Sequence, residues 1–230
     1  MAKSLVPSFK EERLLRREGY NLIAGVDEVG RGALAGPVMA AAVILPPTLK
    51  GAWQKKVRDS KLLSFDQREA LYEPIKKAAI AIGVGSVDSW TIEAIGIARA
   101  TQIAMSQAIN QLAPAAETLL IDYFTIPGVT VPQQGIVDGD SLVFSIACAS
   151  IIAKVTRDRI MSGFDDLYPG YRFGHHKGYG TRDHLDCLQK LGPCPIHRRT
   201  YQPVRDVMGE TMSMHDRLGP RESEIDPDGP

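Results

Sequence analysis

The sequence predicts an α/β protein in which helices cover a mixed β-sheet, and three observations lead to that fold class. Two continuous apolar runs near the start of the chain are separated only by a glycine-rich stretch, which is typical of two buried strands with a tight connection. Further apolar runs then alternate with stretches of helical periodicity, the order expected of a layered α/β domain. The 230 residues are 44% hydrophobic and 23% charged, so the chain can bury a core in one domain, or at most two, and is neither disordered nor fibrous.

Four continuous apolar segments have the composition of buried strands. The first two are joined by the stretch from Gly30 to Pro37, which is short enough for a tight connection. The four segments are residues 22–26, 38–45, 79–87 and 118–121, the last of which ends at Asp122.

Five stretches are predicted to be helical. Ser64 can cap one of them, because a serine hydroxyl accepts a hydrogen bond from the free N–H groups of a first helical turn. The helix nearest the N-terminus carries acidic and basic residues that can pair on its surface. The predicted helices cover residues 10–18, 64–77, 91–112, 141–161 and 181–191.

The two ends of the chain differ in composition from its middle. Residues 1–20 form a charged lead-in, to which we assign no chemistry. Residues 206–230 lose apolar periodicity and end in a sequence rich in Asp, Glu and Pro, which predicts a disordered acidic tail. The folded domain is therefore expected to cover residues 21–205, with residues 181–205 as a C-terminal extension.

Charge and cysteine content restrict the class of protein further. The 27 basic and 27 acidic residues give a net charge of +0, so the whole chain offers no electrostatic argument for nucleic acid or an acidic membrane as a partner. Three cysteines argue against a disulfide framework and for a reducing compartment. No segment resembles a signal peptide or a membrane span. We therefore expect a cytoplasmic protein with no membrane partner.

Four acidic residues lie at the ends of predicted elements. Asp27 and Glu28 follow the first strand, Asp122 ends the fourth, and Asp140 precedes the helix predicted over residues 141–161. Neighbouring side chains in a strand point to opposite faces, so Asp27 and Glu28 converge only if the strand ends or kinks there. Gathered carboxylates repel one another, and divalent cations such as Mg²⁺ or Mn²⁺ relieve that repulsion. Aspartates in such places also act as helix caps and turn residues, so spacing alone leaves both interpretations open.

A set of short motifs resembles the ribonuclease HII family, also called type 2 ribonuclease H. The motifs occur in family order over roughly residues 21–205, which makes the match highly specific. They are Gly25-Val26-Asp27-Glu28-Val29-Gly30-Arg31-Gly32, Asp59-Ser60-Lys61-Leu62-Leu63-Ser64, Leu120-Ile121-Asp122, Gly139-Asp140, the run from Ser145 to Asp158, His176-Lys177-Gly178-Tyr179-Gly180-Thr181 and His197-Arg198-Arg199-Thr200-Tyr201.

This resemblance implies a fold and an activity. The implied fold is a ribonuclease H-like layered domain with a central mixed β-sheet flanked by helices and a C-terminal helical extension. The implied protein is a monomeric endoribonuclease, with residues 21–205 as its catalytic domain, that hydrolyses the RNA strand of RNA/DNA hybrids and nicks duplex DNA 5′ of an embedded ribonucleotide. Two Mn²⁺ (manganese) or Mg²⁺ (magnesium) ions would act in catalysis, leaving 5′-phosphate and 3′-hydroxyl ends. Such an enzyme serves DNA replication and repair.

The resemblance also implies which residues form the site. The catalytic and metal-binding acids would be Asp27, Glu28, Asp122 and Asp140, and the substrate-binding residues would be Gly30, Arg31, Gly32, Tyr179, Lys177 and Arg198. The glycines would let the backbone approach a 2′-hydroxyl, Arg31 would hold a phosphate, and Tyr179 would stack on a deoxyribose. Lys154, Arg157, Arg198 and Arg199 are expected to make phosphate or structural contacts, with Asp158 as a possible ion-pair partner of Arg157.

Tyr123 and Asp138 are two of the positions that depart from the family pattern. Tyr123 stands where the family more often has glycine after the third acid. Asp138 stands where a basic residue is more common. Neither change touches the four acids, although Asp138 adds negative charge beside them.

Other interpretations stay open. A two-metal exonuclease also uses four carboxylates, and a non-catalytic nucleic-acid-binding relative would keep the basic residues and lose an acid. The glycines between Gly30 and Gly36 precede a strand rather than a helix, which argues against a dinucleotide site. A zinc site is a further alternative, since the spacing H-x₂-C…C-x₂-H occurs in His184, Cys187, Cys194 and His197.

The net charge of zero conceals an uneven distribution. Residues 154–205 contain ten basic and five acidic side chains, whereas residues 206–230 contain two and seven. A basic region that is compensated by an acidic tail is compatible with a nucleic-acid partner.

Overall fold

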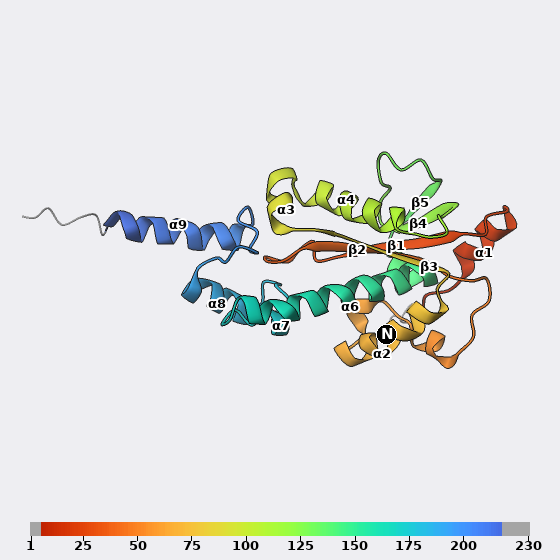
Figure 1. Ribbon diagram of the computed structural model, residues 1–230, viewed down its shortest axis with the longest axis horizontal. Coiled ribbons are helices and arrows are strands. Elements are labelled where there is room, and N and C mark those ends of the chain that lie inside the picture. Colours follow the sequence, from red (N-terminus) through yellow and green to blue (C-terminus); the bar gives the residue numbers. More distant parts are fainter. Residues whose placement is uncertain (1–5, 218–230) are drawn as a thin grey trace, which may run out of the picture.

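The computed structural model describes the backbone of residues 6–217 and the side chains of residues 6–209. Its centre is a mixed five-stranded sheet with the strand order β3-β2-β1-β4-β5 (Figure 1). β1 pairs antiparallel with β2 and parallel with β4, so the predicted mixed sheet is confirmed. The strands are β1 (Ile23–Val29), β2 (Val38–Ile44), β3 (Ala81–Val87), β4 (Thr118–Asp122) and β5 (Gln133–Ile136).

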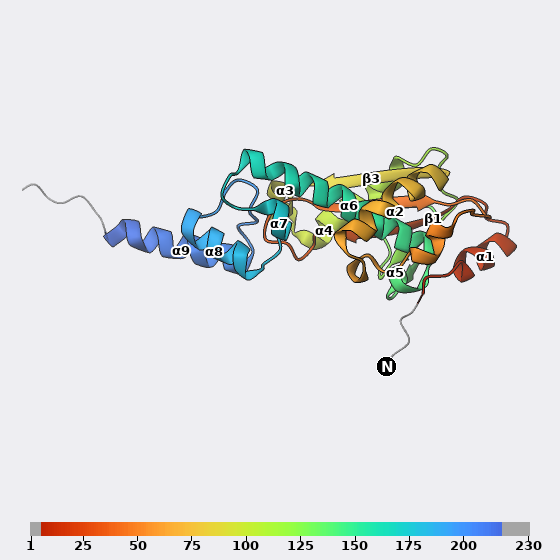
Figure 2. The same ribbon diagram turned by 90° about the horizontal axis from the view of Figure 1, so that it is seen from below.

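Helices cover both faces of the sheet, and the alternation of side chains along β2 shows how. Ala40 and Ala42 belong to the core on the side of α4 (Ile97–Asn110), whereas Ala41 and Val43 belong to the core on the side of α6 (Phe144–Leu167). Because successive strand residues point to opposite faces, a continuous apolar run is what a strand buried on both faces requires. α3 (Ser89–Ile95) lies with α4, and α2 (Phe65–Ala78) lies with α6 (Figures 1 and 2).

Small residues let α4 approach the sheet closely. A Cβ atom on Gly85 would lie 1.9 Å from the carbonyl oxygen of Ala104 in α4, and one on Gly83 would lie 1.9 Å from that of Ala108. No side chain fits in that space, so the glycines of β3 set the distance between the helix and the sheet.

Two of the long predicted helices are each interrupted in the structure. The helix over 91–112 is divided into α3 and α4 at Gly96, which has φ +80°. The helix over 141–161 is divided into α5 (Gly139–Leu142) and α6 by the extended residue Val143. Asp140 therefore lies inside a one-turn helix instead of preceding a long one.

The predicted cap at Ser64 is confirmed. The hydroxyl of Ser64 accepts a hydrogen bond from the backbone N–H of Gln67, and the Gln67 side chain accepts one from the N–H of Ser64. This reciprocal pair fixes the start of α2. The segment before it forms two short 3₁₀ helices, η1 (Ala52–Lys56) and η2 (Ser60–Leu62).

β5 is the strand that the sequence analysis missed. Its residues, Gln-Gln-Gly-Ile, contain a single apolar side chain. It lies at the edge of the sheet beside β4, and the parallel ladder with β4 holds it there. Edge strands bury little, so they lack the apolar pattern by which strands are predicted.

The N-terminal segment packs against the fold. α1 (Lys10–Arg17) forms where a short helix is predicted, and its Glu12 is only 3% exposed. The Glu12 carboxylate accepts a hydrogen bond of 2.9 Å from the backbone N–H of Ser145, in the first turn of α6. Glu12 thus satisfies a free N–H group at the N-terminus of the longest helix, where negative charge is favourable.

The C-terminal part is helical, as predicted, but it extends further than expected. α7 (Phe173–His176), α8 (Arg182–Leu191) and α9 (Gln202–Arg217) lie beyond one end of the sheet (Figure 1). Residues 206–217, the first part of the stretch predicted to be a disordered tail, continue α9 in the structure. Val204 and Val207 anchor this helix by packing with Leu34 and Leu188. The rest of the predicted tail, residues 218–230, lies outside the described residues.

Within residues 6–217, no helix combines enough length with enough apolar character to cross a membrane.

Candidate active site

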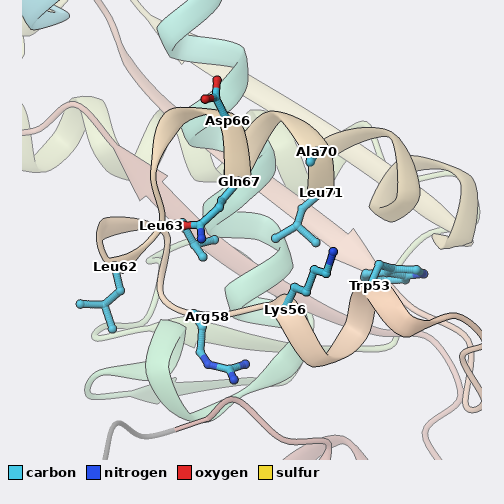
Figure 3. Close-up of a pocket in the computed structure, with 9 residues that line it drawn as sticks. All are labelled: Trp53, Lys56, Arg58, Leu62, Leu63, Asp66, Gln67, Ala70 and Leu71. Atoms are coloured by element: carbon cyan, nitrogen blue, oxygen red, sulfur yellow. The ribbon is translucent and has the colours of Figure 1, made fainter.

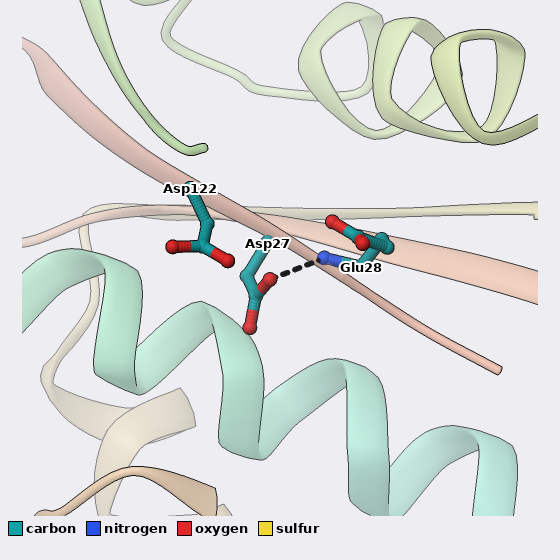
Figure 4. A group of neighbouring side chains, drawn as sticks. All are labelled: Asp27, Glu28 and Asp122. Carbon is teal, nitrogen blue, oxygen red and sulfur yellow. Dashed lines mark hydrogen bonds between the residues drawn. The ribbon is translucent and has the colours of Figure 1, made fainter. Parts of the chain in front are cut away.

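Three of the four predicted acids meet where two parallel strands separate. The last paired residues of β1 and β4 are Val26 and Ile121, and Asp27 and Asp122 follow them directly. β1 itself continues to Val29 along β2. One carboxylate oxygen from each of Asp27, Glu28 and Asp122 lies within 4.8 Å of the others (Figure 4). From the sequence, the strand was expected to end or kink at these acids. In the structure β1 continues along β2 past them, and only its pairing with β4 ends there.

Asp27 is the most deeply buried of the three acids. Its Oδ1 accepts a hydrogen bond of 2.7 Å from the backbone N–H of Glu28 (Figure 4). Burial raises the pKa of Asp27 well above its usual value, and the negative charges of Glu28 and Asp122 raise it further. The pKa of Asp122 is also raised, first by burial and then by Asp140. Positive charge placed among these carboxylates would relieve both effects.

Glu28 contributes an oxygen atom without a partner. Burial raises the pKa of Glu28, although the nearby Arg31 guanidinium opposes the shift. Nη1 of Arg31 lies 3.4 Å from Oε1 of Glu28. The second oxygen, Oε2, is buried and has no hydrogen-bond partner. A buried carboxylate oxygen needs a donor or a cation, and three converging carboxylates are ligands of the kind that Mg²⁺ and Mn²⁺ prefer. The residues present therefore fit a divalent metal site.

Asp140, the fourth predicted acid, is buried near the other three but is held by a lysine. Its Oδ2 lies 3.1 Å from Nζ of Lys61. Burial lowers the pKa of Lys61, but the hydrogen bond and charge of Asp140 outweigh it and raise that pKa above its ordinary value. Asp59 positions the lysine, because its carboxylate accepts a hydrogen bond of 2.9 Å from the backbone N–H of Lys61.

Lys61 is a site residue to which the sequence analysis gave no role. It belongs to the motif from Asp59 to Ser64, so the family resemblance contained a signal for it. The segment is tied to α6 by a hydrogen bond of 2.7 Å between the hydroxyls of Ser60 and Ser150. This hydrogen bond holds η2 near the acids. Hydrophobic periodicity in the sequence does not predict that η2 lies there.

Arg198, predicted to bind substrate, is buried beneath the glycine-rich loop. Its side chain is 0% exposed, and its guanidinium donates hydrogen bonds to the carbonyl oxygens of Gly30, Arg31 and Gly36. A buried guanidinium needs several fixed acceptors, and a looped backbone provides them. The buried Arg198 guanidinium therefore fixes the backbone of the glycine-rich loop from the protein interior.

Arg157 supports the same loop from α6. Its guanidinium donates to the carbonyl oxygens of Ala35, Pro37 and Lys177. A Cβ atom on Gly30, which has φ +88°, would lie 2.3 Å from Nε of Arg157. The ion pair considered between Arg157 and Asp158 is not formed. Asp158 lies instead 2.7 Å from Nζ of Lys154 and 3.7 Å from Nη2 of Arg68.

Tyr179 and Lys177 line a separate pocket of about 620 Å³ to which the four acids do not contribute. The Tyr179 ring lies close to two cations, since Lys154 Nζ and Arg157 Cζ are each 5.2 Å from its centroid. Nζ of Lys177 donates a hydrogen bond of 2.6 Å to the Ser162 hydroxyl. The structure thus places these two predicted residues in a basic pocket beside α6.

A pocket of about 630 Å³ lies between η1, η2 and α2 (Figure 3). None of the predicted catalytic, metal-binding or substrate-binding residues lines it. Its lining residues are Trp53, Lys56, Arg58, Leu62, Leu63, Asp66, Gln67, Ala70 and Leu71.

The residues of the zinc alternative have other roles. Nε2 of His184 and Nε2 of His197 lie 3.0 Å apart, which is a hydrogen bond between the rings. The backbone N–H of Cys194 donates to Nδ1 of His197. Among the side chains of residues 6–209, the group with metal-ligand geometry is Asp27, Glu28 and Asp122. The structure therefore gives the zinc interpretation no support.

The fold and the site together define a class of protein. It is an α/β protein with a mixed sheet in which carboxylates cluster where two parallel strands part, an arrangement suited to divalent cations and hence to phosphodiester chemistry.

Comparisons with known proteins identify the family. The model of the family "Ribonuclease HII" matches residues 24–204. A ribonuclease HII of Dehalococcoides mccartyi is 55% identical over 207 residues, covering 90% of this chain and 98% of that protein. The chain therefore belongs to the ribonuclease HII family, and it is an endoribonuclease, a hydrolase of phosphodiester bonds.

Solved structures agree on the fold. The ribonuclease H2 of Pyrococcus horikoshii OT3 superposes with a TM-score of 0.69 at 23% identity, covering 83% of this chain and 98% of that one. Bst-RNase HIII, solved in complex with Mn²⁺, has a TM-score of 0.67 at 16% identity and covers 86% of this chain and 72% of that one. At this level of identity the two structures confirm the ribonuclease H-like fold.

Proposed function

We propose that this endoribonuclease hydrolyses the RNA strand of RNA/DNA hybrids and also nicks duplex DNA on the 5′ side of an embedded ribonucleotide. The observation that supports it best is the convergence of Asp27, Glu28 and Asp122, including the unpartnered Oε2 of Glu28, beside Arg31. Three acids next to one arginine suit a phosphate that is bridged by metal ions and held by a guanidinium. The products would carry 5′-phosphate and 3′-hydroxyl ends.

Asp27, Glu28 and Asp122 would hold the metal, and Asp140 would complete the set of four acids. Two Mn²⁺ or Mg²⁺ ions, when bound, would supply an activated water and would offset the charge that develops on the leaving oxygen. The carboxylates themselves raise one another's pKa values, so they favour a bound cation over an empty site.

The surrounding residues would bind and orient the nucleic acid. The backbone of Gly30 and Gly32 would face the 2′-hydroxyl, which is the group that distinguishes RNA from DNA. A Cβ atom on Gly32 would meet nothing within 4 Å, so that face of the loop is open. Tyr179 would stack on the deoxyribose beyond the ribonucleotide, and Lys177 would bind a phosphate of the backbone.

We further propose that the protein acts as a monomer in the cytoplasm, in ribonucleotide removal during DNA replication and repair. The three cysteines are free thiols in the structure, which fits a reducing compartment.

A covalently closed circular duplex with a single ribonucleotide tests the proposal. The wild-type protein should nick this circle with Mn²⁺ or Mg²⁺ present and leave a matched all-DNA circle intact. A two-metal exonuclease cannot begin on a closed circle, and a non-catalytic relative would bind it without cleavage. An intact circle at enzyme concentrations that cleave a linear hybrid would overturn the nicking activity.

A further inference from the structure

Tyr123 has an unusual backbone conformation for a bulky residue. It directly follows Asp122, has φ +69°, and its side chain is 66% exposed. A non-glycine residue with positive φ is uncommon, and the conformation costs free energy that a glycine would not incur. Since the ring is largely outside the core, packing does not account for a tyrosine at this position.

The backbone around Tyr123 is fixed by its neighbours. The N–H of Tyr123 donates a hydrogen bond of 2.8 Å to the carbonyl oxygen of Ile136 at the end of β5, and the N–H of Phe124 donates one of 2.9 Å to the carbonyl oxygen of Asp122. The turn that starts after the acidic residue is therefore held by the sheet edge. The fold therefore maintains the strained backbone conformation of the residue that follows Asp122.

Tyr123 is the outer member of a row of side chains that leads to the acids. Its ring meets that of Phe124 edge to face, with 6.3 Å between centroids and an interplanar angle of 82°. The guanidinium carbon of Arg31 lies 5.7 Å from the Phe124 ring centroid. Arg31 in turn pairs with Glu28. The row therefore starts at the Glu28 carboxylate, continues through Arg31 and Phe124, and ends at the exposed ring of Tyr123.

The row and Tyr179 belong to different parts of the structure. Tyr179 contacts Lys154 and Arg157 of α6, whereas Tyr123 lies between β4 and β5 at the sheet edge. Exposed aromatic rings beside a phosphate-binding cation are how proteins hold the sugar and base faces of nucleotides, and such contacts tolerate any base.

We propose that Tyr123 is a substrate-binding residue whose exposed ring packs on a nucleotide next to the scissile phosphate. This rests on the proposed function, because it requires that a phosphodiester of the nucleic acid lies at the acids and Arg31. The ring adds binding energy to a nucleotide that the acids do not touch. Its contribution should therefore appear in KM and leave the chemical step unchanged.

Steady-state kinetics on an RNA/DNA hybrid provide the first test. Stacking on an aromatic side chain is worth about 1–3 kcal/mol, so Tyr123→Gly should raise KM at least about 5-fold while kcat changes less than about 2-fold. Tyr123→Phe keeps the ring and the row and should behave as the wild type. Relief of the positive φ offsets the entropy lost with glycine, so the Tm of Tyr123→Gly should stay within about 3 °C of the wild type.

Arg172→Gly is the matched control. Arg172 also has a positive φ, +62°, and its exposed side chain pairs with Asp183 in the C-terminal part of the chain. Glycine at this position relieves the same kind of strain, and KM should not change. An equal rise in KM in both variants would show that backbone freedom, and not the ring, causes the effect.

Duplexes shortened from one end at a time locate the contact. Trimming on the side that Tyr123 contacts should raise the KM of the wild type to that of Tyr123→Gly, so that the two proteins become equal. Trimming the other side should keep their ratio. The proposal is overturned if Tyr123→Gly binds the full hybrid with wild-type KM, or if the ratio survives trimming from either end. A wild-type protein that cleaves no hybrid would instead contradict the proposed function.

Discussion

The imidazole rings of His184 and His197 form a direct hydrogen bond, with their Nε2 atoms 3.0 Å apart. Nδ1 of His197 accepts from the N–H of Cys194 at 3.0 Å, so its Nε2 must carry the proton and donate to His184. Nδ1 of His184 is then the protonated nitrogen, and it donates to the carbonyl oxygen of Tyr179 at 3.0 Å. Two neutral histidines with fixed tautomers thus hold the backbone that carries Tyr179.

The buried, neutral pair of His184 and His197 predicts that the folded state loses stability in acid. Burial lowers the pKa of His197 to about 3 and that of His184 to about 4, against about 6.5 in the unfolded chain. Above pH ~6.5 both states are neutral and the stability is complete. Below it the unfolded chain binds protons that the native state rejects, so the free energy of unfolding falls by up to about 1.4 kcal/mol per pH unit for each histidine.

Urea unfolding of the wild type and His184→Gln, compared between about pH 8 and about pH 5, measures this loss. His184→Gln should show a shallower decline, while His175→Ala, which removes an exposed histidine, should keep the wild-type slope. Buried carboxyls with raised pKa act in the opposite direction in every variant, so the difference between proteins isolates the histidine. Parallel curves for wild type and His184→Gln would refute the assignment.

Asp27→Asn should abolish most cleavage. The amide removes one negative charge from the three-carboxylate group, so turnover should fall by orders of magnitude and Mn²⁺ binding, measured by calorimetry, should weaken. Hybrid binding should survive, because the basic residues are unchanged. With EDTA present the variant should be at least as stable as the wild type, since a buried repulsive charge has been removed.

Asp138→Asn is the control for this variant. Asp138 is exposed and lies two residues before Asp140, so its loss removes the same charge close to the site without removing a ligand. Turnover of Asp138→Asn should stay within a few-fold of the wild type. Near-normal cleavage by Asp27→Asn would refute the catalytic assignment.

Lys61→Met should tighten metal binding while it slows the reaction. The ammonium group 3.1 Å from Asp140 competes with a cation for that carboxylate. Its removal should lower the apparent Kd for Mn²⁺ by about 5-fold, corresponding to about 1 kcal/mol of charge interaction. Turnover should fall because Asp140 loses the group that positions it. Lys56→Met, on neighbouring η1, is the control and should change neither quantity.

Arg198→Lys should destabilise the protein without affecting phosphate contacts. Lysine cannot replace the fork of hydrogen bonds to Gly30, Arg31 and Gly36, so the free energy of unfolding should fall by about 2–5 kcal/mol. Arg199→Lys, a neighbouring substitution, should cost much less because Arg199 is exposed. Equal unfolding free energies for the two variants would show that the buried guanidinium is dispensable.

Salt dependence of hybrid binding separates Lys177 from Arg198, two of the three cations that were predicted to bind substrate. Lys177→Ala should reduce the slope of log K against log salt by about 1, as expected when one phosphate contact is lost. Any Arg198 variant that folds should keep the wild-type slope. A reduced slope for a folded variant that lacks the charge, such as Arg198→Gln, would support the substrate contact that the burial of Arg198 argues against.

The sequence was most informative where one residue pattern has one physical meaning. Continuous apolar runs at β1 to β4 predict strands because both faces are buried, and Ser64 predicts a cap because its hydroxyl has a fixed set of partners. β5 was missed because an edge strand has little to bury. The packing of α1 and of the start of α9 was not predicted, because the contacts of Glu12 and Val207 form only once α6 and α8 are in place.

For the site, the sequence by itself identified the family and predicted the four acids and the glycine-rich loop, since these predictions depend on residue type and order. Tertiary structure decided which of these residues meet and which are buried. It brings Asp122 to Asp27 through a parallel ladder between distant segments, turns Asp140 toward Lys61, and buries Arg198 under the loop. Distances between segments and the burial of a charge depend on packing, which local sequence does not encode. The same holds for Tyr123, whose positive φ is imposed by hydrogen bonds to β5.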